Sequence, residues 1–143
     1  MKRTLCFALG LMLLTATEAL AQDVCAPAKV TTLATQTYYA SIKITWTATG
    51  DDCSTGNAST YEVRYSNSTI TDINWQSASV LATGSSVTNG NVDCAIFTGS
   101  CPGPVTKYFA VFLFDAAGNR SPISNVVAGS TRCSSPFTVP DCP

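Results

Sequence analysis

The sequence contains no histidine, and only 12% of its 143 residues are charged. The lack of histidine excludes the Ser-His-Asp triad, the Cys-His dyad and the zinc sites that use imidazole ligands. The formal net charge is -1, with 8 Lys and Arg against 9 Asp and Glu and no basic cluster. We therefore expect no nucleic-acid partner, because binding to phosphates requires a concentrated basic surface.

The sequence also lacks an apolar run long enough to cross a bilayer. Its longest such run, residues 5–14, is too short for a comfortable span. Lys2 and Arg3 precede this run, and the small-residue pattern Ala19-Leu20-Ala21 follows it. These features predict a secretory signal peptide over residues 1–21. The mature protein is then expected to be secreted or extracytoplasmic, in the periplasm or outside the cell, with no membrane insertion.

Cysteine is the residue type that stands out among those present. One of the 7 cysteines, Cys6, lies in the predicted signal, and 7 - 1 = 6 remain. These are Cys25, Cys53, Cys94, Cys101, Cys133 and Cys142. An even number of cysteines in an exported chain predicts disulfides. The sequence has no C-x-x-C motif among these cysteines, so it does not indicate a zinc or redox site. Spacing alone does not choose among the possible pairings.

The mature sequence alternates apolar and polar residues with the period of two that is typical of β-strands. The clearest examples are residues 41–47 and 61–65. Their predicted inward residues are Ile42, Ile44, Trp46, Tyr61, Val63 and Tyr65. Further strands are expected at 92–97, 108–114 and 123–127, with a weaker one within 73–81. Short strands separated by turn signals, without a helical apolar stripe, predict an antiparallel β-sandwich.

Several segments resemble a fibronectin type III domain in order and spacing. They are Ile44-Thr45-Trp46, Gly50-Asp51-Asp52, Tyr61 to Ser66, Asp115 to Ser121 and Ser124 to Val127. The resemblance covers about residues 27–131. It implies an all-β fold, an antiparallel seven-stranded immunoglobulin-like sandwich with disulfides, which we assign to residues 22–131. Residues 132–143 contain three prolines and two cysteines and are expected to form a C-terminal tail pinned by a disulfide.

One segment departs from the family pattern. A tyrosine normally precedes the sixth strand, and Lys107 takes its place here. A Cys94–Cys101 bridge would close the same turn covalently. The family topology further implies a Cys25–Cys53 bridge at one pole, with the other four cysteines near the opposite pole. The preferred set is therefore 25–53, 94–101 and 133–142, with cross-pairings among the last four cysteines as the alternative.

The sixth strand carries the main candidate binding residues. Matching Phe109, Val111 and Leu113 to the family's inward positions leaves three aromatic residues on the outer face, namely Tyr108, Phe112 and Phe114. An exposed aromatic row indicates a protein interface, because aromatic residues dominate binding hot spots. Two alternatives remain: the tail or the region of Trp75 covers the row, or the row stacks against sugars. Tyr38 and Tyr39 are further interface candidates.

Acidic residues give no sign of catalysis or metal binding. Asp51, Asp52, Asp115 and Asn119 are expected in loops at one pole, without the spacing of a calcium loop. Adjacent carboxylates on a polar loop also lack the burial that raises a pKa for acid–base work. Turn formation is the expected role of these residues. We expect no catalytic residue, no cofactor and no metal.

The sequence thus predicts a secreted, non-catalytic protein–protein interaction module that is not an enzyme. Its expected partner is another extracellular or envelope protein. Two alternatives remain open: a structural or surface component that assembles with itself, and an accessory domain that binds carbohydrate through Tyr108, Phe112 or Trp75. Self-association would indicate the first alternative, and retention on insoluble polysaccharide the second.

Overall fold

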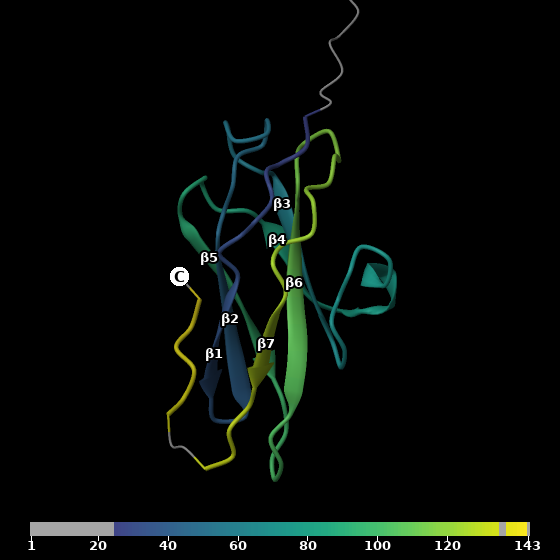
Figure 1. Ribbon diagram of the computed structural model, residues 1–143. Helices are drawn as coiled ribbons and strands as arrows, with labels where there is room; N and C mark the ends of the chain where they lie inside the picture. The colour runs from purple at the N-terminus through teal and green to yellow at the C-terminus, as the bar shows by residue number, and fades with distance from the viewer. Residues whose placement is uncertain (1–24, 135–136, 143) are drawn as a thin grey trace, which may run out of the picture.

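A computed structural model describes residues 25–134 and 137–142 (Figure 1). The predicted signal peptide, residues 1–21, lies outside the described residues. The elements are β1 Ala34–Tyr38, β2 Ser41–Thr47, β3 Thr60–Ser66, the 3-10 helix η1 Trp75–Ser77, β4 Ser79–Ser85, β5 Val92–Thr98, β6 Thr106–Phe114 and β7 Val127–Ser130. Across the described ranges, no helix has the length and apolar character that a bilayer crossing requires.

The strands form two antiparallel sheets that face each other. One sheet has three strands in the order β1-β2-β5, and the other has four in the order β4-β3-β6-β7. The predicted all-β, antiparallel, seven-stranded sandwich is confirmed. Strands β2, β3 and β5 lie where the sequence pattern placed them, and β6 contains the segment 108–114, which was expected as a central strand because it is apolar on both faces. This agreement follows from the pattern itself, since each of these strands buries alternate side chains against the opposite sheet.

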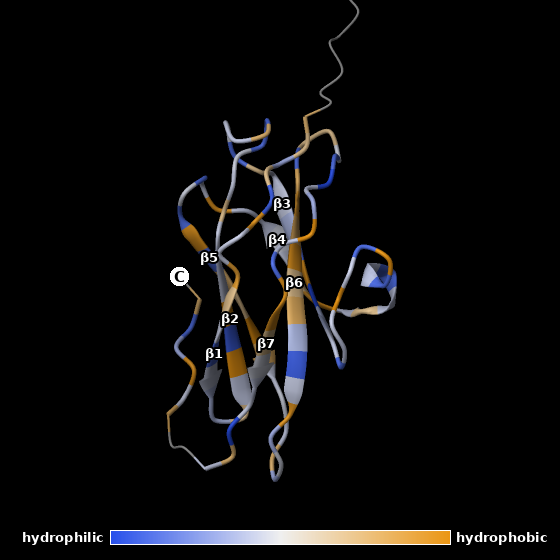
Figure 2. Ribbon diagram, in the orientation of Figure 1, coloured by the Kyte–Doolittle hydropathy of each residue, from blue (hydrophilic) through white to orange (hydrophobic). Residues whose placement is uncertain are grey.

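The core between the sheets includes the predicted inward residues, of which Tyr61 and Tyr65 are only half-buried. Ile42, Ile44 and Trp46 on β2 are at most 1% exposed, and Figure 2 shows polar and apolar residues alternating along this strand. On β6 the inward residues Phe109, Val111 and Leu113 are fully buried. Aromatic rings connect the sheets edge to face, with Trp46 and Tyr61 centroids 5.1 Å apart and Phe97 and Phe109 centroids 5.8 Å apart. Each large side chain buried here contributes about 1.5–3 kcal/mol relative to exposure.

Two of the expected strands have other bounds, and β1 occupies residues 34–38, for which no strand range was expected. The strand expected within 73–81 begins only at Ser79, because residues 75–77 form the 3-10 helix. The last strand begins at Val127, not at residue 123. Pro122 has no N–H to donate to a ladder, and the Ser121 and Ser124 hydroxyls accept the N–H groups of Leu113 and Val111 instead. The Ser121 and Ser124 N–H groups still donate to the Leu113 and Val111 carbonyls, so side chains replace only the other half of the strand pairing next to this part of β6.

The structure contains three disulfides, and only one has the preferred pairing. Cys25–Cys53 is confirmed, whereas Cys94–Cys101 and Cys133–Cys142 are wrong. The observed bridges are Cys94–Cys142 and Cys101–Cys133, one of the cross-pairings that were left open. Strand β5 runs about 13 Å from Cys94 to its end, beyond the Cα separation of about 7 Å that a disulfide tolerates. Cys101 instead lies beside the chain that leaves β7, where Cys133 meets it.

Candidate functional site

The aromatic row predicted on β6 is not an open surface. Phe112 is fully buried, while Tyr108 and Phe114 are half-buried. The cause is the segment between β3 and β4, residues 67–78, which lies beside β6 in Figure 1 and which we call the cover. Of the alternatives that the sequence left open, covering by the Trp75 region is the one observed. The expectation that Phe112 is exposed for binding is therefore wrong in this conformation.

A second small core holds the cover against the sheet. Its buried members are Ile70, Trp75, Ala78, Ala110 and Phe112. The Trp75 ring meets the Phe112 ring edge to face, with centroids 4.1 Å apart. Trp75 is only 2% exposed, so neither of these rings offers a face to a sugar. The packing indicates that the aromatic row stabilises the fold.

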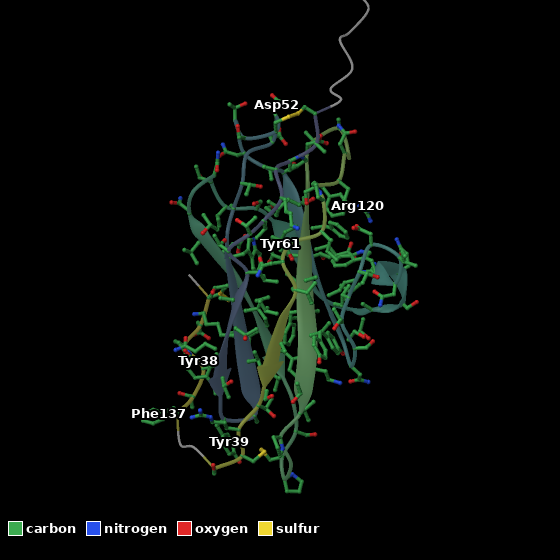
Figure 3. All side chains as sticks on the ribbon, viewed as in Figure 1. Tyr38, Tyr39, Asp52, Tyr61, Arg120 and Phe137 are labelled. Atoms are coloured by element: carbon green, nitrogen blue, oxygen red, sulfur yellow. A yellow bond between two sulfur atoms is a disulfide. The ribbon has the colours of Figure 1, made fainter. Side chains whose placement is uncertain are left out.

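Two arginines contact the cover, one near its end and one near its middle. The Arg64 guanidinium pairs with Glu62 and lies 5.2 Å from the Trp75 ring centroid. Its Nη1 donates hydrogen bonds to the carbonyls of Trp75 and Ala78 at 3.0 and 3.2 Å, near the end of the 3-10 helix. Arg120 lies 4.1 Å from the Phe112 ring and 3.9 Å from a carboxylate oxygen of Asp72 (Figure 3). Arg64 and Arg120 therefore both contact the cover and help to hold it against β6.

The tail, residues 137–142, approaches the three-stranded sheet. The Cys94–Cys142 disulfide ties its end to β5. The Lys43 ammonium on β2 donates hydrogen bonds to the carbonyls of Pro140 and Asp141, at 3.2 and 2.9 Å. The tail is thus pinned by a disulfide as expected, although its partner is Cys94 on β5 instead of the neighbouring Cys133.

Among residues 25–134 and 137–142, five large apolar side chains remain exposed. They are Tyr39 at 47%, Ile73 at 96%, Val80 at 52%, Val92 at 55% and Phe137 at 73%. The backbones of the two aromatic members are neighbours, because the Tyr39 N–H donates to the Phe137 carbonyl at 3.3 Å. Both lie at the end of the sandwich that carries the turn from β1 to β2, opposite Asp52 (Figure 3). The exposed Arg132 forms a β-bridge with Tyr39, and we call Tyr39, Arg132 and Phe137 the aromatic pole.

Backbone hydrogen bonds and disulfides hold the aromatic pole in place. Ala40, in the turn next to Tyr39, has a φ of 50°, a left-handed conformation that costs an alanine about 1 kcal/mol. Its N–H donates to the Arg132 carbonyl at 2.8 Å, and its carbonyl accepts the Gly99 N–H at 2.7 Å. Phe137 lies in the chain between the bridged residues Cys133 and Cys142. Tyr39 is therefore presented on a turn that is fixed from several sides, and Phe137 on a segment held between two disulfides.

Asp115 stabilises the loop in which it lies. The Asp115 carboxylate accepts the Asn119 backbone N–H at 2.7 Å and its side-chain amide at 2.6 Å. Burial tends to raise the pKa of Asp115, but hydrogen bonds from Asn119, Gly118 and Ala117 outweigh it and lower that pKa. Over residues 25–134 and 137–142, no group of three or more potential metal-binding side chains occurs. Asp115 thus has the predicted role of a turn residue.

Asp93 is an acidic residue between the sheets that the sequence pattern did not identify. Asp93 lies opposite Trp46 in the β2–β5 pairing and shares the inward face of β5 with Ala95 and Phe97. Within the described part of the chain, Asp93 Oδ2 and Trp46 Nε1 are buried without a hydrogen-bond partner. Burial raises the pKa of Asp93, against hydrogen bonds from Cys94 and Val87, and the pKa of Tyr61 rises through burial and the Asp93 charge. The sequence feature that could have revealed Asp93 is its place at an inward position of the strand 92–97.

Comparisons with known proteins show few similarities. No family model matches the chain, and no curated protein matches it. The spore cortex lytic enzyme SleM of Clostridium perfringens has a TM-score of 0.48 and 16% identity, over 73% of this chain and 28% of that one. A beta-1,2-glucanase from Parabacteroides distasonis has a TM-score of 0.46 and 20% identity, over 84% of this chain and 14% of that one. This chain thus spans less than a third of either protein.

Proposed function

We propose that this protein is a secreted, non-catalytic module of the fibronectin type III type that binds another extracellular or envelope protein through the aromatic pole. Three disulfides indicate an oxidising, extracytoplasmic environment. The division into three and four strands, with β4 beside β3, supports the family assignment. The predicted signal peptide supports secretion.

The observation that carries the proposal is the exposure of Tyr39 and Phe137 on two chain segments that a backbone hydrogen bond joins. The outer faces of both sheets carry segments of the chain itself, the cover on one and the tail on the other. Tyr39 and Phe137 are the exposed large aromatic side chains that remain in the described residues. Aromatic residues and arginine are enriched at interfaces, and tyrosine and arginine in particular at hot spots. A surface fixed by disulfides also loses little conformational entropy when a partner binds.

The charge at the aromatic pole indicates the kind of partner. Arg132 is exposed and forms no ion pair with any residue that the structure describes. Its guanidinium suits a carboxylate, with which it forms two parallel hydrogen bonds. The complementary protein surface would therefore present a carboxylate beside an apolar pocket for the two rings.

The test begins with crosslinking capture from the source's own envelope and culture fluid, using the mature protein. The captured partner is then purified, and its affinity is measured for a Tyr39→Ser, Phe137→Ser variant. An Ile73→Ser, Val80→Ser variant is the matched control, because it removes two other exposed large apolar side chains. Two hot-spot residues are each worth about 2 kcal/mol, so the first variant should bind on the order of a thousandfold more weakly. Equal affinity of all three proteins would refute the aromatic pole as the binding surface.

The same experiment addresses self-assembly. Strand β4 is a sheet edge, but its register shifts opposite Val63 and Arg64, and such a bulge disfavours edge-to-edge pairing. Capture of the protein alone, together with a concentration-dependent mass in sedimentation, would instead favour a structural component. A monomer that captures a distinct protein supports the interaction module.

A further inference from the structure

A polar cavity lies at the same end of the sandwich as the turn from β1 to β2, but between other strands. Its volume is about 270 Å³, and its lining residues are Tyr65, Ser66, Asn67, Ser77, Ser79 and Lys107. They come from the end of β3, the cover, the start of β4 and the start of β6. Sites for drug-sized ligands typically measure about 300–1,000 Å³. This cavity therefore suits one small molecule or a single unit of a larger one.

Lys107 gives the cavity a positive charge. It occupies the position where the fibronectin resemblance leads one to expect a tyrosine. Its ammonium donates to Asn67 Oδ1 at 2.5 Å and lies 5.7 Å from the centre of the Tyr65 ring. No carboxylate forms an ion pair with it among residues 25–134 and 137–142. Neutral groups surround this cation, so the cavity favours a ligand with a negative charge.

Hydroxyl groups form much of the remaining wall. Ser66, Ser77 and Ser79 each contribute a group that can both donate and accept hydrogen bonds. The Ser66 hydroxyl already accepts the Ser68 N–H at 3.2 Å, which fixes its position. An apolar ligand would leave these groups without partners, at a cost for each one. A ligand rich in hydroxyls would satisfy them.

We propose that this cavity binds a single carboxylate-bearing sugar unit of the uronic acid type. The carboxylate would pair with the Lys107 ammonium, and the sugar hydroxyls would bond to the serine side chains. This site is separate from the aromatic pole, and it differs from sugar stacking on the buried rings of Phe112 and Trp75. It does not depend on the proposed protein partner, so either proposal can fail alone.

The experiment is an NMR titration of the ¹⁵N-labelled mature protein with glucuronate. We expect saturable shifts in the amide signals of residues 65–67, 77–79 and 107. Glucose, which lacks the carboxylate, and inorganic phosphate, which lacks the sugar ring, should each bind at least about fivefold more weakly. Equal binding of glucose would overturn recognition of the charge. Equal binding of phosphate would overturn recognition of the sugar, and shifts confined to other residues, or none, would overturn the site.

Variants test the roles of the two chemical groups. Lys107→Gln should weaken glucuronate binding about tenfold, the usual effect of losing one charged hydrogen bond. Lys29→Gln is the matched control, since it removes the same charge from an exposed lysine. Lys29 follows Ala28, whose N–H donates to the Gly50 carbonyl. A Ser77→Ala, Ser79→Ala variant keeps the test valid if Lys107→Gln fails to fold, and it should weaken glucuronate more than phosphate. Unchanged affinity in folded Lys107→Gln, or in folded Ser77→Ala, Ser79→Ala, contradicts the proposal.

Discussion

Replacement of Trp75 by alanine tests whether the cover belongs to the cooperative fold. The Trp75 side chain is 2% exposed, its ring lies 4.1 Å from that of Phe112, and Arg64 lies 5.2 Å from its centre. Truncation of a buried Trp or Phe to alanine usually costs about 3–5 kcal/mol. We expect about 3 kcal/mol here, the lower end, because the second core is small and lies outside the two sheets. The Arg64 hydrogen bonds to the cover would weaken as well.

The measurement is urea denaturation of both proteins, followed by circular dichroism. The loss should appear as a lower midpoint with little change in slope, if the cover unfolds together with the sandwich. Ile73→Ala is the matched control, because Ile73 belongs to the same segment and is 96% exposed. Its effect should stay within about 0.5 kcal/mol, as for most surface positions.

A loss below about 1 kcal/mol for Trp75→Ala would refute this reasoning. The cover would then be a loop that rests on β6 without stabilising it. Hydrogen exchange gives a second readout: amide protons of Ala110 and Phe112 should exchange faster in the variant, because Phe112 loses its covering ring. If the variant also bound a partner that the natural protein ignores, the aromatic row would be a latent interface.

Three further predictions concern other parts of the molecule. Burial raises the pKa of Asp93 above its ordinary value of 3.8, so the natural protein should lose stability as pH rises from that value through the raised pKa. Asp93→Asn should lack this loss in pH-dependent urea denaturation, and the same pH dependence in both proteins would contradict the assignment. Ala40→Gly relieves the φ of 50° and should stabilise the protein by about 0.5 kcal/mol, whereas a lower melting temperature would contradict strain there. Removing the Cys94–Cys142 bridge, with a sequence separation of 48, should cost about 4 kcal/mol in the chain-entropy model, and it should speed hydrogen exchange of the Tyr39 amide, which donates to Phe137. Unchanged exchange at Tyr39 would show that the tail stays in place without the disulfide.

The strand core was predictable because its signal is local. In β2 and β6 the side chains that face the opposite sheet recur at every second position, and the structure buries them. The start of β7 was not predictable in the same way. Ser124 lies in the segment expected to be a strand and Ser121 in the loop before it, and their hydroxyls accept N–H groups of β6 in place of backbone carbonyls.

Covering by the Trp75 region and a pinned tail were expected as possibilities, but their detailed paths could not be predicted because they depend on contacts between distant residues. Residues 67–78 contain mostly polar and turn-forming residues, and the sequence shows no period that would place Trp75 on Phe112. Arg64 looked like an outward charge on β3, and only the fold reveals that it holds the carbonyls of the cover. The disulfide partners likewise depended on the path of the tail across the sheet. Tyr39 was an interface candidate from the sequence, whereas Phe137 joined it only through that path.

The position of the exposed aromatic residues follows from how this small domain is stabilised. A short chain buries a limited core, and here disulfides and a second core on the outer face of one sheet add to it. Covering that face removes Phe112 from the surface, and the tail pinned to Cys94 places Phe137 beside Tyr39. The elements that stabilise the fold therefore also determine which aromatic residues a partner can reach. For this reason, a loss of partner binding in the Cys94–Cys142 variant should accompany release of the tail even where the sandwich stays folded.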